Sequence, residues 1–542
     1  MMDQDRLTHL FTGNVTLNPL ELDFVKHEIE ARSTTIHQLE VQLGVLKAER
    51  EIHQLELQLE ILKAEREMYQ ALLSPLRRNL LPPEILGEIF SISVSTSTKL
   101  SWDCQLNTLC RVCRVWRDAA LAMPALWAHV KGLYIDAPKK LDVARVREWF
   151  KRSGSVKKTL HIDGLHRRNR SCHLSPQNEL TNLLVDGPPL DTLSLTCVYA
   201  ECIETIIQQV ASRAGEGQLC DSLRSLHLGM IHAKSDMSLG VIWAILDVIP
   251  TIRTLSLDLS HFHFDWDVPG NLSQSNLTTF SIACDWPISL LLEILRACPN
   301  IETLILDHKG LIRRISNAVN TPVLLPKLET LRMQGLVSYS TDTDIFCHLQ
   351  LPSLYTLDIA FVPIGREDPQ DLDTPVGRNI VALVSGGPNQ ATNLQHLRFE
   401  SLAISSQGLH SILSSLPMLA HLTLDKLRSQ SRFFREACAF PTQLLPRLRT
   451  LRILNTSEFV TFENDDVYDF LVNRKHTATE EVPDSLEEVE LVISRCRPDI
   501  DKQAQRLCYL SSEVGLRVSV TIVQVLFLIF QRGFFLSNCD YL

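Results

Sequence analysis

Cysteine and histidine side chains gather in one stretch of the chain at a spacing that could bind zinc. Cys110 and Cys113 form a C-x-x-C pair, with Cys104 before them and His129 after them. A closed structural zinc site needs four ligands of this kind. No second close pair is present, and Cys113 also fits an apolar helical stripe described below. We therefore expect no metal site here.

Three acidic residues recur at the ends of predicted strands and could suggest paired carboxylates for acid–base catalysis: Asp258, Asp307 and Asp425. They are far apart in the sequence, and a repeated unit explains them without catalysis. The sequence also lacks a phosphate-binding glycine loop and the H-E-x-x-H and G-x-S-x-G motifs. We expect a non-catalytic protein without a cofactor.

The composition is that of a folded protein with more than one structural part. A chain of 542 residues is too long for one ordinary core, so several domains or a repeat array are expected. The formal charge of −10 argues against a nucleic-acid binder. The fourteen cysteines have no regular spacing, and the N-terminus lacks a signal-peptide pattern. Both features indicate free thiols in the cytoplasm, the nucleus or both.

Residues 18–74 are predicted to form a long helix after a flexible N-terminus, 1–17. Asn18 can cap it, Pro19 suits its first position, and Glu21 can reach back to the cap. The helix contains a duplication: H-Q-L-E-V-Q-L-G-V-L-K-A-E-R-E from His37 is repeated almost unchanged from His53, sixteen residues later. Each copy has apolar residues at the spacing of a short coiled coil.

Two interpretations of this duplication stay open. Sixteen residues rotate an α-helix about 160° beyond whole turns, so the two apolar stripes point almost opposite ways on one straight helix. The helix could therefore offer two short apolar faces, and a homo-oligomer through residues 37–67 is possible. Alternatively, the duplication merely extends a solvated helix.

A repeated unit occupies most of the predicted fourth region, residues 133–512. Its clearest copies are I-L-D-V-I-P-T-I-R-T-L-S-L-D, I-L-R-A-C-P-N-I-E-T-L-I-L-D and I-L-S-S-L-P-M-L-A-H-L-T-L-D. In each copy a proline ends an amphipathic helix, and alternating apolar residues then predict a short strand. Eleven apolar triplets begin at Leu190, Leu223, Ile252, Leu277, Ile301, Leu328, Leu354, Leu394, Leu419, Leu448 and Leu486.

These repeats resemble leucine-rich repeats, although the asparagine that the family places after the strand is missing. A strand and helix of this length cannot bury their own apolar face, so neighbouring copies must stack. The resemblance implies an α/β solenoid with parallel strands and a concave face that binds a protein target. The expected target-binding residues on that face are Thr254, Ser256, Asp258, Thr303, Asp307, Arg332, His396, Arg398, His421, Asp425 and Arg452.

The last region, residues 513–542, does not continue the repeat pattern. It contains V-S-V-T-I-V-Q-V-L-F-L-I-F-Q, whose β-branched start predicts a buried strand. The alternative is a membrane anchor, which we do not expect, because a fourteen-residue helix spans only about 21 Å of a hydrocarbon core of roughly 30 Å. No role is assigned to this region.

Residues 75–132 carry the most specific motifs in the chain. L-P-P-E-I-L starts at Leu81, V-C-R-V-W-R starts at Val112, and P-A-L-W starts at Pro124. The prolines can open a helix, on which Ile85, Ile89 and Ile92 share one face. In a predicted second helix Leu109, Val112, Cys113, Trp116 and Ala120 form one stripe, and Leu126-Trp127 closes a third short turn.

This set of motifs resembles an F-box, and it is similar to the F-box proteins abundant in mushroom-forming fungi. The resemblance implies a small three-helix domain that binds the Skp-type adaptor of a cullin-RING ubiquitin ligase. The implied adaptor contacts are Leu81, Pro82, Ile85, Leu86, Ile89, Phe90, Val112 and Trp116. A domain of fewer than sixty residues has a thin core, so an exposed apolar helix face suits a partner.

Two functions follow from this organisation. The first is a non-catalytic substrate receptor of a ubiquitin ligase, whose F-box binds the adaptor while the repeats hold a protein target. The second is a leucine-rich-repeat scaffold that acts outside any ligase and self-associates through the duplicated helix.

Overall fold

The chain divides into two compact units, Met1–Asp163 and Gly164–Leu542. The first unit therefore extends beyond residue 132, the predicted end of the F-box. The computed structural model describes residues 18–45, 49–72, 81–96, 102–134, 143–164, 178–197, 200–213, 222–230, 249–259, 276–286, 288–308, 322–336, 341–362, 375–385, 393–429, 433–437, 444–456, 464–477, 484–494 and 516–523.

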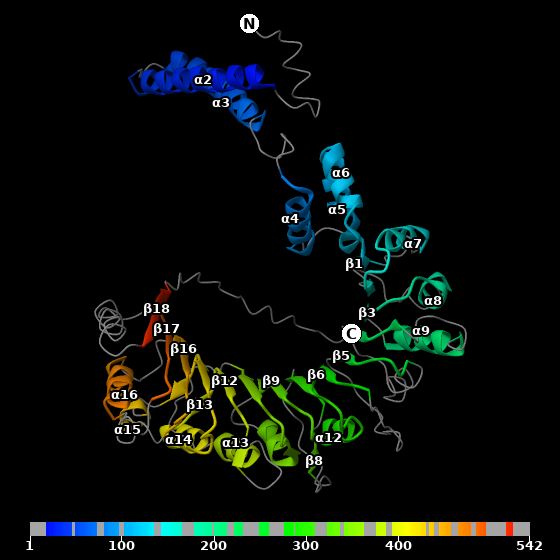
Figure 1. Cartoon of the computed structure of the whole chain (residues 1–542), viewed down its shortest axis with the longest axis vertical. Coiled ribbons are helices and arrows are strands. Elements are labelled where there is room, and N and C mark those ends of the chain that lie inside the picture. The colour runs from blue at the N-terminus through cyan, green and yellow to red at the C-terminus, as the bar shows by residue number, and fades with distance from the viewer. Residues whose placement is uncertain are drawn as a thin grey trace, which may run out of the picture. The chain divides into compact units, whose positions relative to one another are not determined.

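The first unit begins with two helices, α2 (Pro19–Val45) and α3 (Glu49–Leu72). The predicted start is confirmed: the Glu21 amide donates to Asn18 Oδ1 over 2.9 Å, and the Asn18 amide donates to Glu21 Oε2 over 3.0 Å. The predicted single long helix is described as two helices that pack against each other (Figure 1), with residues 46–48 outside the described residues.

The two copies of the duplicated stripe explain this packing. Ile36 is buried in α2, and Leu55, Leu59 and Leu62 are half-buried in α3. A reversal of the chain lets two stripes that would point apart on one straight helix face each other. An ion pair between Arg32 Nε and Glu65 Oε2, 2.8 Å apart, joins the two helices beside this seam. The seam that could support self-association is thus occupied within the chain.

The rest of the first unit contains short helices and two strands. Their bounds are α4 (Pro83–Thr96), α5 (Trp102–Val112), α6 (Arg114–Leu121), η1 (Pro124–Trp127), β1 (His129–Tyr134), α7 (Val143–Arg152) and β2 (Thr159–Gly164). Strand β1 pairs with β2 in parallel. These two strands were not among the eleven predicted triplets.

The second unit is a parallel β-solenoid, as the repeats predict. In the part of the chain that the structure describes, twelve of its strands lie side by side in sequence order. They are β3 (Thr192–Cys197), β4 (Ser225–Met230), β5 (Thr254–Leu259), β6 (Thr279–Cys284), β7 (Thr303–His308), β9 (Thr330–Leu336), β11 (Thr356–Phe361), β12 (His396–Glu400), β14 (His421–Asp425), β16 (Thr450–Thr456), β17 (Glu488–Ser494) and β18 (Arg517–Val523).

The helices of the second unit lie between these strands in sequence. They are α8 (Asn178–Asp186), α9 (Ala200–Arg213), α12 (Ile288–Arg296), η3 (Thr341–His348), α13 (Pro375–Ser385), α14 (Ser406–Ser414), α15 (Phe433–Ala437) and α16 (Asn464–Thr477). Figure 1 shows the strands as a row of arrows, with α12, α13 and α14 along one side. Two short parallel pairs complete the unit: β8 (Val323–Leu324) with β10 (Leu349–Gln350), and β13 (Ala403–Ile404) with β15 (Arg428–Ser429).

All eleven predicted triplets are confirmed as strands, each beginning two residues after the first apolar residue of its triplet. In β5, for example, Leu255 and Leu257 are buried while Thr254 and Ser256 are partly exposed. This alternation places one apolar row in the core and leaves the other row on the open face.

Three of the prolines that precede a triplet, Pro250, Pro326 and Pro446, take part in contacts between neighbouring repeats. The carbonyl oxygen of each accepts a hydrogen bond from a polar side chain of the following repeat. Asn276 Nδ2 donates to Pro250 O over 2.9 Å, and Ser353 Oγ donates to Pro326 O over 2.6 Å. These bonds satisfy backbone carbonyls at the turn between repeats.

The end of the sheet corrects one expectation. The apolar segment near the C-terminus does begin with a strand, β18, which pairs in parallel with β17. It lies at the sheet edge and is not buried, since Val518 and Val520 are only partly covered. Residues 524–542 lie outside the described residues. Among those described, no helix combines the length and apolar character needed to cross a bilayer.

Candidate functional site

Helix α4 separates its apolar side chains onto two faces. Leu86 and Phe90 are buried, with 3% and 0% of their surface exposed. Ile85, Ile89 and Ile92 are 47%, 37% and 60% exposed. Their spacing of four and then three residues places these isoleucines in one outward stripe. The described residues of this unit therefore leave an apolar face of α4 open.

The predicted second helix is two helices separated at Cys113. Cys113 has extended backbone angles (φ −161°, ψ 170°), and its Sγ accepts a hydrogen bond from the Trp116 amide at 3.4 Å. The thiol thus caps α6, and the single five-residue stripe expected from the sequence is wrong. Burial raises the pKa of the neighbouring Cys110 thiol, although Arg117 and Arg152 oppose this rise. Among the described residues, no group of three or more His, Cys, Asp or Glu side chains is placed to hold a metal ion.

Trp116 points into the small core of this region. Its ring packs on Phe90, with centroids 5.1 Å apart and planes tilted by 58°. Val112, by contrast, is 55% exposed at the end of α5. The break at Cys113 therefore gives these two expected adaptor contacts opposite environments.

The third predicted turn is present as η1 and closes the core. Trp127 is 1% exposed, and its Nε1 donates to Ala120 O over 2.7 Å. Its ring also packs against Trp149, with centroids 4.5 Å apart, and lies under the Arg152 guanidinium at 4.5 Å. Helix α7 is thus part of this small domain, which explains why the compact unit continues past residue 132.

The expected adaptor contacts divide into three groups by exposure. Pro82, Ile85, Ile89 and Val112 are exposed; Leu81 and Trp116 are half-buried; Leu86 and Phe90 belong to the core. The set omitted two exposed apolar side chains of the same region, Ile92 and Leu121, the latter 44% exposed. The helical spacing of Ile92 from Ile85 and Ile89 was the signal that could have added it.

The open face of the sheet carries a set of ion pairs between neighbouring strands. Arg332 Nε lies 3.0 Å from Asp358 Oδ2. The Arg398 Nη2 atom lies 2.9 Å from both Glu400 Oε2 and Asp425 Oδ2. These pairs follow from the register, since Arg332, Asp358 and Arg398 occupy the same position on β9, β11 and β12.

Two more pairs complete this charged region, which we call the ion-pair face: Lys426 Nζ with Glu400 Oε1 at 3.1 Å, and Arg452 Nε with Glu490 Oε2 at 3.0 Å. The charges of its members balance. The expected target-binding residues Arg332, Arg398, Asp425 and Arg452 are therefore already paired within the sheet, which lowers their conformational freedom before any partner binds.

Aromatic and imidazole rings form a short ladder beside the ion-pair face. His396 and His421 are in register on β12 and β14, and their rings stack with centroids 4.2 Å apart and planes 9° apart. The Tyr355 hydroxyl lies 3.2 Å from His396 Nε2. Burial and the neighbouring His421 lower the pKa of His396; burial, Arg449 and Arg452 lower that of His421, against Glu488 and Glu487.

The earlier strands present hydroxyl and acidic groups on the same face. Thr254 and Thr303 occupy equivalent strand positions, and Ser256 Oγ lies 2.9 Å from His227 Nδ1. Asp258 and Asp307 are separated by β6, so their backbones are about 9 to 10 Å apart at ordinary strand spacing. That separation does not make a proton-sharing carboxylate pair, and Asp425 lies on the more distant strand β14.

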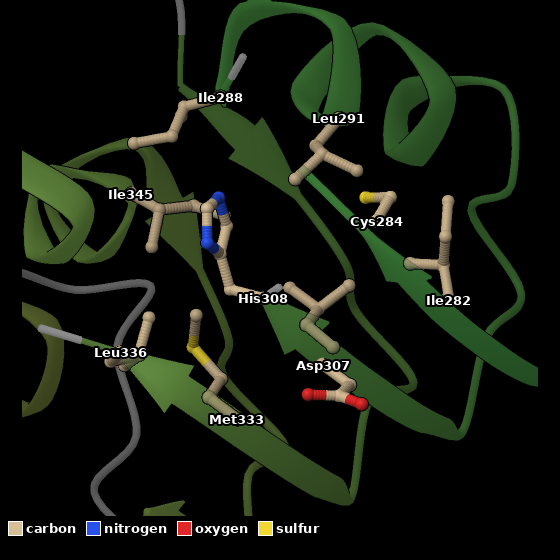
Figure 2. Close-up of a pocket in the computed structure, with 10 residues that line it drawn as sticks. Ile282, Cys284, Ile288, Leu291, Asp307, His308, Met333, Leu336 and Ile345 are labelled. Atoms are coloured by element: carbon tan, nitrogen blue, oxygen red, sulfur yellow. The ribbon is translucent and has the colours of Figure 1, made fainter. Parts of the chain in front are cut away.

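A small cavity lies between the C-terminal ends of β6, β7 and β9 and the helices beside them (Figure 2). Its volume is about 20 Å³, and its lining is mostly apolar, including Ile282, Leu291 and Met333. His308 and Cys284 also line it. A cavity of this size holds about one water molecule, so it is a packing gap and not a ligand site.

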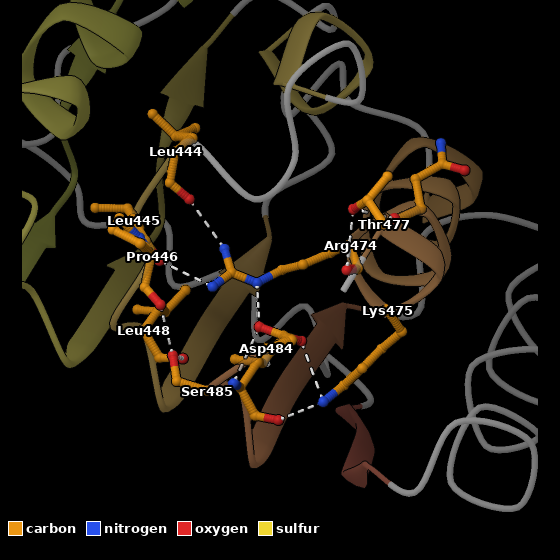
Figure 3. A network of polar contacts seen from close by, with 11 residues as sticks. Leu444, Leu445, Pro446, Leu448, Arg474, Lys475, Thr477, Asp484 and Ser485 are labelled. Carbon is orange, nitrogen blue, oxygen red and sulfur yellow. Dashed lines mark hydrogen bonds and ion pairs between the residues drawn. The ribbon is translucent and has the colours of Figure 1, made fainter. Parts of the chain in front are cut away.

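A buried arginine joins α16 to the turns before β16 and β17 (Figure 3). Arg474 is 1% exposed; its Nε lies 2.7 Å from Asp484 Oδ1, and its Nη1 and Nη2 donate to Leu444 O and Leu445 O over 2.9 and 2.8 Å. Lys475 Nζ lies 3.1 Å from Asp484 Oδ2. These contacts tie the guanidinium to two backbone carbonyls and a carboxylate, so the cluster stabilises the repeat.

Comparison with known proteins identifies the small domain. Residues 79–131 match the family model described as F-box-like, which corresponds to α4 through the first residues of β1. No curated protein matches the chain. Among solved structures, the chain is similar to a Bacteroides fragilis protein at 13% identity, over 57% of this chain and 69% of that one, with a TM-score of 0.28. This likeness is too low to bear on function.

Proposed function

We propose that this protein is the substrate-recognition subunit of an SCF-type cullin-RING ubiquitin ligase. The F-box-like domain binds the Skp-type adaptor, and the leucine-rich-repeat-like solenoid holds a protein target. The observation that carries the proposal is the outward apolar stripe Ile85, Ile89 and Ile92 on α4, within the F-box-like match. Exposed apolar stripes of this kind mark protein interaction sites.

The structure supports a division of labour among the expected adaptor contacts. The exposed isoleucines of α4 and Val112 of α5 contact the adaptor, whereas Leu86, Phe90 and Trp116 hold the helices in place. Burial of the three isoleucine side chains by a partner would contribute on the order of 1.5 kcal/mol each before the costs of association.

The ion-pair face and the ring ladder support target binding by the solenoid. Side chains that are already paired lose little conformational freedom when a partner arrives. The balanced charges suit a protein surface of mixed charge, and the overall charge of −10 supports no role with nucleic acid. In this proposal the protein is not an enzyme, works in the cytoplasm or nucleus, and leaves ubiquitin transfer to other subunits.

Co-purification of the full chain with a co-expressed Skp-type adaptor tests the proposal. The wild-type chain is expected to retain the adaptor, and the variant Ile85→Asp/Ile89→Asp is expected to lose it. Both side chains are exposed, so a polar replacement leaves the core intact. Val156→Asp is the matched control, because Val156 is 36% exposed in the same unit but outside the F-box-like match.

Circular dichroism of each variant separates lost binding from lost folding. If the folded double variant retains the adaptor as well as the wild type does, α4 is not the docking surface and the proposal fails. Loss of the adaptor by Val156→Asp as well would show that the effect is not specific to α4.

A further inference from the structure

Helix α3 carries a second apolar stripe that its hairpin partner does not cover. Leu57, Ile61 and Met68 are 59%, 52% and 42% exposed, and Ala64 between them is exposed too. Successive members are four, three and four residues apart. At about 100° per residue they fall within an arc of about 60°, so the four side chains make one continuous stripe, which we call the outer stripe.

The outer stripe lies opposite the seam with α2. The seam side of α3 consists of Leu55, Leu59, Leu62 and Tyr69, which are half-buried or buried. On an α-helix the centres of these two stripes are about 150° apart. Packing of the hairpin therefore uses one side of α3 and leaves the other free, within the described residues of this unit.

The residues flanking the outer stripe are acidic. Glu60 and Glu67 are exposed and lie seven residues apart along one flank. On the other flank is Glu65, which is paired with Arg32 of α2. The nearby cation, Lys63, points instead towards Glu40 of α2, 3.4 Å from its Oε1. In a coiled coil, the residues that flank the apolar seam select the partner by charge.

The charges beside the outer stripe distinguish between two occupants, a second copy of α3 and a helix of another protein. A second copy of α3 would place glutamates against glutamates, because Glu60 and Glu67 would face their own copies or Glu65 in either orientation. Like charges at these positions destabilise the pair. A helix with lysine or arginine beside its own apolar stripe would form favourable pairs with Glu60 and Glu67.

We propose that the outer stripe of α3 is a docking surface for an amphipathic helix of a partner protein whose apolar stripe is flanked by lysine or arginine. The first copy of the duplicated segment shows the same exposure: Val41, the equivalent of Leu57, is 56% exposed. This surface is separate from the F-box-like domain, so it binds its partner whether or not an adaptor is present.

A designed helical peptide tests this surface without knowledge of the natural partner. The probe is a synthetic 21-residue peptide with leucine at heptad positions a and d and lysine at e and g; a second peptide carries glutamate at e and g. Fluorescence anisotropy with the full chain is expected to show binding of the lysine peptide. The glutamate peptide should bind at least tenfold more weakly. Raising the salt concentration from about 50 to about 300 mM should lower the affinity of the lysine peptide.

Variants of α3 locate the binding. Ile61→Gln/Met68→Gln is expected to weaken the lysine peptide at least tenfold, and Glu60→Lys/Glu67→Lys to reverse the preference between the peptides. Val41→Gln is the matched control, since this side chain is equally exposed but lies on α2; it should leave binding unchanged.

Two results would overturn the proposal. One is equal affinity of the wild type and of Ile61→Gln/Met68→Gln for the lysine peptide, with both chains equally helical. The other is a dimer of the wild-type chain in light scattering that Ile61→Gln abolishes, which would assign the outer stripe to a second copy. Adaptor co-purification is expected to be unaffected by these variants, so failure here is distinct from failure of the ligase proposal.

Discussion

Phe90 of α4 and Trp116 of α6 pack their rings together, with centroids 5.1 Å apart. This contact ties the first helix of the F-box-like domain to its third α-helix. Phe90 is fully buried, so the pair forms the centre of a thin core. Phe90, an expected adaptor contact, therefore packs inside the domain, whereas its neighbours Ile85 and Ile89 on the same helix are exposed.

Replacement of Trp116 by alanine should destabilise the first unit. The change removes the ring that covers Phe90 and leaves a cavity, at a cost of about 2 to 4 kcal/mol. Urea unfolding followed by far-ultraviolet circular dichroism measures this loss of stability. Trp116→Phe should lose less stability than Trp116→Ala. An unchanged unfolding midpoint combined with lost adaptor binding would show instead that Trp116 touches the adaptor directly.

Replacement of Arg474 by methionine should destabilise the second unit by roughly 3 to 5 kcal/mol, because it leaves a buried carboxylate and two carbonyls without the guanidinium. The free energy of unfolding in urea measures this. The matched control is Arg213→Met, whose ion pair with Asp186 is exposed and should contribute about 0 to 1 kcal/mol. Equal losses for the two variants would contradict the assigned role of Arg474.

The histidine stack should make the solenoid less stable in mild acid. Both histidines have a folded-state pKa below 6.5, the value expected in the unfolded chain. Well above pH 6.5 both states are neutral, so the pair adds no pH dependence there. As the pH falls below 6.5 the unfolded chain binds protons that the folded chain resists, so the free energy of unfolding decreases.

Urea unfolding at about pH 7.5 and about pH 5.5 measures this effect. His396→Gln/His421→Gln should show a smaller decrease than the wild type, since other groups titrate alike in both chains. The charged groups that face His421 are Arg449, Arg452, Glu487 and Glu488, and both chains retain them. A decrease of the same size in both chains would exclude the stack as its source.

The local parts of the fold could be predicted from the sequence. Asn18 and Glu21 form their capping bonds, and all eleven apolar triplets are strands. These features depend on residues a few positions apart, and their chemistry is set by backbone geometry. The stripe of Ile85, Ile89 and Ile92 on α4 could be predicted from the sequence for the same reason.

Other features depend on contacts between distant residues. Arg398 and Asp425 are 27 residues apart and meet only because their strands align in register. The alternating charges at one strand position, on Arg332, Asp358 and Arg398, could have revealed the pairing once a register was assumed. The helix break at Cys113 was hidden, because a cysteine in an apolar stripe normally continues a helix, whereas here its sulfur caps the next one.

Hydrogen–deuterium exchange of the full chain with and without a Skp-type adaptor tests the central claim most directly. We predict that the adaptor slows exchange in α4 and at the end of α5, while the strands β5 to β7 exchange at unchanged rates. A bound adaptor that leaves exchange in α4 unaltered, or the absence of any complex with the folded chain, would contradict the proposed role of the Ile85, Ile89 and Ile92 stripe.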